Sequence, residues 1–178
     1  MLLGVEPRPA RIAVALVLVG IYSTLAVARR ISNALRDANL LRVSVAVAFA
    51  LSLVVLVVFV IRSPSLRRPR VVLSLLGLAG VYALVVWPMD SPEEKLHFLE
   101  YGVVAVLAFF AAPVKWVGGS RYVFAALFTG AAGWLDEGIQ ALLPSRYYDL
   151  RDVGFNALAG GMALVSVAIY RRLTSSHA

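Results

Sequence analysis

Polar and ionisable residues occur as three pairs inside three apolar segments of the C-terminal half of the chain. The members of each pair are three or four positions apart, so in a helix both side chains point to the same face. Imidazole and carboxylate groups can act as general acids and bases, and amide groups can hold them in place. The combination predicts a site for acid–base chemistry. The pairs are His97 with Glu100, Glu137 with Gln140, and Asp152 with Asn156.

The helical hairpins that these segments form are expected to bring the three pairs together. The first pair lies near the start of residues 96–114, the second near the end of 122–143 and the third near the start of 150–170. Consecutive segments run in opposite directions, and each residue adds 1.5 Å to a helix, so all three pairs are expected roughly 4–13 Å below the same membrane face. Because ionisable groups are costly when they face lipid, we expect them to face one another or a water-filled cleft.

The composition indicates that these helices lie in a membrane. Hydrophobic residues make up 61% of the 178-residue chain, and a membrane-crossing helix needs about 20 mostly apolar residues. We expect an all-α, polytopic bundle of about six transmembrane helices. A short interfacial helix is also expected over residues 31–41, where the apolar side chains share one face. The expected transmembrane segments are 11–28, 43–61, 71–87, 96–114, 122–143 and 150–170.

The pattern divides the chain into two parts. Residues 1–70 are predicted to form an N-terminal two-helix extension with the interfacial helix, and residues 71–178 a four-helix membrane core. Within the core, Ser91 is a good N-cap, Pro92 suits a first helical turn and Glu94 stands at the capping-box position. The first polar helix of the core is therefore expected to begin at Pro92.

Basic residues are concentrated in the first part of the chain. Residues 1–70 hold ten basic and two acidic residues, whereas the remainder holds seven basic and eight acidic ones. The arginines flank apolar segments, which indicates anionic lipid headgroups as partners and not nucleic acid. The positive-inside rule places both termini in the cytoplasm and the polar cleft on the extracytoplasmic side. Four arginines within residues 29–42 are the exception to this orientation.

Three stretches of the chain resemble the sequence elements of the VanZ-like family, and they occur in the family's order. They are residues 94–101 (EKLHFLEY), 136–140 (DEGIQ) and 144–156, which lie within residues 71–172. The resemblance implies a multi-pass protein of the bacterial cytoplasmic membrane, in a family whose members are linked to low-level teicoplanin resistance. Carried over position by position, the family's marked residues fall on Lys95, His97, Tyr101, Glu137, Gln140, Arg146, Asp152 and Asn156.

These observations favour a membrane enzyme that acts on a lipid-linked or cell-wall-related molecule. Lys95 and Arg146 would hold an anionic headgroup or phosphate. A non-catalytic protein that modulates the envelope and a proton- or ion-coupled carrier are the alternatives. The candidate catalytic residues are His97, Glu137 and Asp152, and the candidate substrate-binding residues are Lys95, Glu100, Tyr101, Gln140, Arg146 and Asn156.

No cofactor is predicted, and the sequence does not indicate an oligomeric state. The donor types leave a divalent metal site as an alternative, although no two ligands have a tight spacing such as that of a HExxH helix. Its ligands would be His97, Glu100, Glu137 and Asp152.

Overall fold

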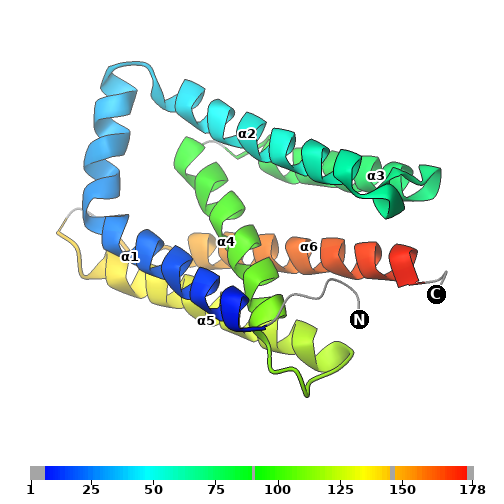
Figure 1. Ribbon diagram of the computed structural model, residues 1–178. Helices are drawn as coiled ribbons and strands as arrows, with labels where there is room; N and C mark the ends of the chain where they lie inside the picture. Colours follow the sequence, from blue (N-terminus) through cyan, green and yellow to red (C-terminus); the bar gives the residue numbers. More distant parts are fainter. Residues whose placement is uncertain (1–6, 90, 145–146, 176–178) are drawn as a thin grey trace.

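The computed structural model describes residues 7–89, 91–144 and 147–175. Over these residues the chain forms six α-helices and one short 3-10 helix, with no strand (Figure 1). The all-α prediction is therefore confirmed. The elements are α1 (Pro7–Asp37), α2 (Leu41–Arg62), η1 (Pro64–Arg67), α3 (Pro69–Val86), α4 (Pro92–Ala111), α5 (Gly119–Ala141) and α6 (Leu150–Ser175).

Helix α1 differs from its prediction, because it continues to Asp37 and no separate helix begins near residue 31. It turns sharply partway along its length (Figure 1). Thr24 Oγ1 donates to the carbonyl oxygen of Gly20 at 2.9 Å and Ser23 Oγ to the same oxygen at 3.2 Å, a pattern that bends helices. The helix ends where Asn39 adopts a left-handed conformation with φ of 57°. Residues 31–37, which were expected in an interfacial helix, thus belong to the end of α1, and residues 29–37 are termed the bent end of α1.

Local signals set the start of two helices near the polar residues. The Ser91 hydroxyl accepts a hydrogen bond from the backbone N–H of Glu94 at 3.3 Å, and Pro92 opens α4. The predicted N-cap is therefore confirmed. At α6 the carboxylate of Asp149 accepts from the backbone N–H of Arg151 at 2.8 Å, which satisfies one of the unpaired donors of the first turn.

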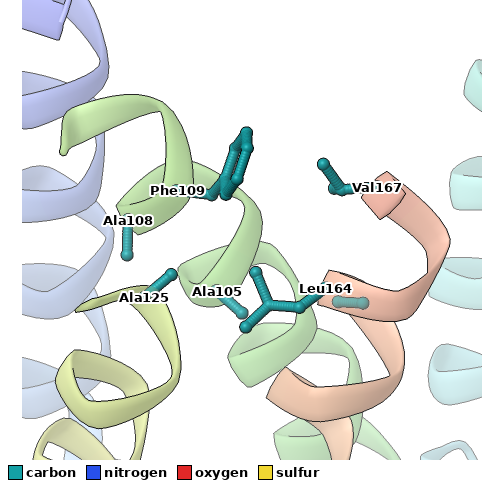
Figure 2. Packing of buried hydrophobic residues seen from close by; sticks show 7 residues of the cluster. Ala105, Ala108, Phe109, Ala125, Leu164 and Val167 are labelled. Atoms are coloured by element: carbon teal, nitrogen blue, oxygen red, sulfur yellow. The ribbon is translucent and has the colours of Figure 1, made fainter. Parts of the chain in front are cut away.

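Helix α4 is the central element of the packing. Its buried positions include Tyr101, Ala105 and Ala108, at helical spacing along one stripe. Figure 2 shows the apolar cluster in which Ala105, Ala108 and Phe109 of α4 meet Ala125 of α5 and Leu164 and Val167 of α6. The alanines leave room for close helix–helix approach, which is the usual basis of helix association in membranes.

Helix α1 is part of the same packing unit as the C-terminal helices. Val14 and Ile21 pack against Val104 of α4. The Tyr22 hydroxyl donates to the carbonyl oxygen of Ala132 on α5 at 2.8 Å. Helices α2 and α3 bury few residues by comparison. The boundary predicted at residue 70 therefore divides the sequence but not the packing. Helix α1, from the first part, packs against helices of the second part.

Four helices of the described chain are long and apolar enough to cross a membrane, namely α1, α2, α3 and residues 150–173 of α6. This is fewer than the six that were expected. Helix α4 carries Glu94, Lys95 and Glu100, and α5 carries Asp136 and Glu137 among several glycines, so neither meets the combined limits on hydropathy and charge that the other four helices meet. Side chains along α2 are mostly exposed and apolar, as a lipid-facing helix requires.

Candidate functional site

A buried carboxylate, Asp136, is at the centre of the polar residues. It is fully buried on α5. Its Oδ2 accepts a hydrogen bond of 2.9 Å from the Tyr101 hydroxyl and lies 3.6 Å from Nδ1 of His97. The imidazole of His97 stacks on the Tyr101 ring, with centroids 6.4 Å apart. Asp136 therefore holds Tyr101 by a hydrogen bond and lies close to His97, whose Nδ1 is buried and hydrogen-bonds to no described residue.

A second buried carboxylate, Glu137, faces a different neighbour. Its Oε1 accepts a 2.9 Å hydrogen bond from Gln140 Nε2, and its Oε2 accepts a 3.1 Å bond from the backbone N–H of Asp149. Gln140 Nε2 also lies 3.4 Å from Oδ1 of Asp136. Since Asp136 and Glu137 are adjacent on a helix, their side chains diverge by about 100°, so one meets α4 and the other meets the start of α6. Gln140 links the two carboxylates.

A cavity of about 310 Å³ lies next to this network. Five parts of the chain form it: the bent end of α1, the start of α4, the end of α5, the α5–α6 connection and the start of α6. His97 and Gln140 line the cavity, whereas Asp136 and Glu137 are buried behind them. Its lining residues are Arg29, Ser32, Asn33, Arg36, Ser91, Glu94, His97, Gln140, Tyr147, Asp149 and Asp152.

The three predicted pairs are distributed around this cavity in different ways. His97, Gln140 and Asp152 line it, and Glu137 supports Gln140 from inside. The Glu100 carboxylate is 3.7 Å from His97 Nδ1. The site that the helix spacing predicted is thus assembled from one lining residue of each pair.

The remaining predicted residues lie away from the cavity lining. Tyr101 is fully buried and acts on Asp136. Lys95 is half-buried on α4 and does not line the cavity. Arg146 lies outside the described residues. Lys95, the one described residue of the two cations expected to hold an anionic group, is therefore not part of the cavity wall.

Asn156 lies deeper, where α5 and α6 approach most closely. A Cβ added at Gly133 would come within 2.8 Å of the Asn156 Cβ, and one added at Gly160 within 2.8 Å of Thr129 Cγ2. Asn156 and Thr129 are buried, and their side-chain polar atoms hydrogen-bond to no described residue. Gly133 and Gly160 are therefore two positions that only glycine can occupy without a shift of the neighbouring atoms.

Two contributions to the site were missed in the sequence. Asp136 lies outside the three predicted pairs, although a carboxylate in an apolar helix already predicts a buried partner. Arg29 and Arg36 were attributed to the membrane surface. With Ser32 and Asn33 they follow a spacing of three, one and three, which places all four on one helical face, and this signal was present in the sequence.

The four candidate metal ligands do not form a metal-binding group. Among the residues that the structure describes, no three His, Asp or Glu side chains are arranged to hold an ion. Both oxygens of Glu137 already accept hydrogen bonds from the protein.

No family model, curated protein or solved structure matches the chain. The resemblance to the VanZ-like family therefore rests on the three sequence elements. The geometry itself offers an imidazole beside a buried carboxylate at the wall of a polar cavity, and that arrangement is suited to moving a proton to or from a molecule in the cavity.

Proposed function

We propose that all six helices lie in the bilayer of a bacterial cytoplasmic membrane, with α4 at the centre of the packing. The buried carboxylates of α5 point toward α4 and α6 and not outward. Helices shielded in this way need less apolar sequence than lipid-facing ones. The basic loops support an orientation with both termini in the cytoplasm, which places the cavity on the extracytoplasmic side.

Within that membrane, we propose that the protein is a VanZ-like enzyme that acts on a lipid-linked or cell-wall-related molecule, with a link to glycopeptide resistance. One observation carries the enzymatic part of the proposal. His97 lines the cavity while its Nδ1 faces the buried Asp136 at 3.6 Å. A carboxylate close to one ring nitrogen can orient the imidazole ring, and the other nitrogen is then left for the substrate.

The other groups have roles that follow from their positions. Asp152 lines the cavity and is, after His97, the second candidate catalytic residue that can touch a substrate. Glu137 holds Gln140 and the backbone at Asp149, so it positions the cavity wall. Tyr101 keeps Asp136 in place through its hydroxyl. His97 is thus the proton-transfer group, and the buried carboxylates act through it or through Gln140.

A non-catalytic protein that binds an envelope component is the second candidate function. It is favoured by one feature, since both oxygens of Glu137 are engaged within the protein. Such a protein would reduce glycopeptide sensitivity when it is expressed in a sensitive host. Unchanged sensitivity would count against this alternative.

The enzymatic proposal is tested by turnover. Full-length protein in lipid nanodiscs would be incubated with envelope lipids extracted from bacteria, and lipid-linked species would be followed by mass spectrometry. We expect a product that forms with the wild type and with Asp37→Asn, an exposed α1 residue outside the cavity lining, but not with His97→Gln. Equal product from His97→Gln and the wild type, or no product from any sample, would refute the proposal.

A further inference from the structure

The arginines that break the positive-inside pattern are part of the cavity wall. Arg29 and Arg36 lie on the bent end of α1, and both line the cavity together with Ser32 and Asn33. Arg30, the immediate neighbour of Arg29, does not line it, although all three arginines are exposed. One face of this helical segment therefore supplies two guanidinium groups and two neutral polar side chains to the same space as His97.

Charge is segregated between the elements that form the cavity. The two arginines come from α1, whereas the carboxylates of Glu94, Asp149 and Asp152 come from α4, the α5–α6 connection and α6. Guanidinium groups present paired N–H donors that match phosphate oxygens. Carboxylates accept hydrogen bonds from hydroxyl or amino groups. A cavity with both walls suits a ligand that is anionic at one end and rich in donors at the other.

The size of the cavity limits the part of the ligand that can lie inside it. A volume of 310 Å³ corresponds to about ten water molecules at roughly 30 Å³ each. This is room for a phosphate with a small polar substituent, and a larger molecule would extend beyond it. A lipid headgroup fits this description, since its acyl chains would lie outside the cavity in the bilayer.

We propose that the bent end of α1 binds the phosphate of the ligand through Arg29 and Arg36, and that the ligand is a phosphate ester carrying hydroxyl or amino groups. The inference deepens the proposed function by naming the substrate class of the same site. The role that the sequence suggested for Lys95, which does not line the cavity, passes to α1. Helix α1 is then a functional part of the protein, because the cavity is incomplete without it.

Binding can be measured without turnover. Full-length protein in phosphatidylcholine nanodiscs would be titrated with short-chain phosphatidylglycerol, whose headgroup combines a phosphate with hydroxyls, and in parallel with inorganic phosphate. Arg29→Ala is the test variant, and Arg30→Ala is its matched control, since both remove one arginine from adjacent positions of one helix. Thermal unfolding of each variant establishes that it is folded, and Arg29→Lys keeps the charge if Arg29→Ala is not folded.

We expect Arg29→Ala to weaken phosphatidylglycerol binding roughly 10- to 100-fold, the loss of one charge-assisted contact. Arg29→Lys is expected to have a smaller effect, and Arg30→Ala to change the affinity less than about twofold. Saturable binding of inorganic phosphate with the same dependence on Arg29 would identify a free phosphate as the source, and binding of the lipid alone would identify a headgroup. Equal effects of Arg29→Ala and Arg30→Ala, or no saturable binding of either probe, would overturn the inference. Arg29-dependent binding without turnover would instead refute only the enzymatic proposal.

Discussion

At Gly133 the structure leaves no room for a single added methyl group. In Gly133→Ala the new Cβ would stand 2.8 Å from the Cβ of Asn156 and 3.2 Å from its Nδ2. Carbon atoms in good contact are about 3.5–4.0 Å apart, so the first distance is short by about 0.7 Å or more. The Asn156 Cβ is bonded directly to the α6 backbone, and rotation of the side chain cannot move it away. Helix α6 itself must therefore shift away from α5.

The shift has an energetic and a structural consequence. Overpacking of this kind destabilises a protein by about 1–3 kcal/mol. At roughly 2–4 °C per kcal/mol for a chain of this size, Tm should fall by about 2–12 °C. The 3.1 Å hydrogen bond between Glu137 and the backbone of Asp149 joins the same two helices and would lengthen as they separate.

The measurement is thermal unfolding of the purified protein in detergent or nanodiscs. Gly130→Ala is the matched control, because it lies one turn away on α5 and its added Cβ meets nothing within 4 Å. The control gains helix propensity without a clash, so it is expected to match the wild type or to be more stable by up to about 1 kcal/mol. If Gly133→Ala and Gly130→Ala unfold at the same temperature, the close approach of α5 and α6 at this point is wrong.

Two further substitutions test the same packing and the buried network. Gly160→Ala should lower Tm because its Cβ would stand 2.8 Å from Thr129 Cγ2, whereas Gly161→Ala, which meets nothing within 4 Å, should not; a reversed order in thermal unfolding would contradict the helix register. Tyr101→Phe should destabilise the protein by about 1–3 kcal/mol, since it removes the hydroxyl that donates to the buried Asp136, and wild-type stability in denaturant unfolding would exclude that hydrogen bond as a major contributor.

The helices and their limits were largely predictable because their signals are local. Long apolar runs identified all six helices, and Ser91 with Pro92 fixed the start of α4. The meeting of the polar pairs could also be foreseen, since α4, α5 and α6 follow one another and their hairpins leave little choice of neighbours. Consecutive helices with short connections usually pack together.

What could not be predicted depends on contacts between distant parts of the chain. Tyr22 and Ala132 are 110 positions apart, and no local pattern predicts that α1 packs across α4 and α5. That packing brings Arg29 and Arg36 to the cavity. Asp136 was left out of the predicted site for a related reason. The predicted pair of Glu137 and Gln140 marks one face of α5, whereas contacts with α4 on one side and α6 on the other bury a wider arc of the helix.

Proton transfer by His97 to or from a molecule held in the cavity can be tested by turnover. The rate of His97→Ala in nanodiscs would be measured with and without imidazole in the buffer. The substitution leaves space for a free imidazole beside Asp136. We expect a rate lower by roughly 10²–10⁴-fold, the usual contribution of a general acid or base, and partial recovery of that rate with imidazole. Wild-type turnover in His97→Ala without imidazole would contradict proton transfer by His97.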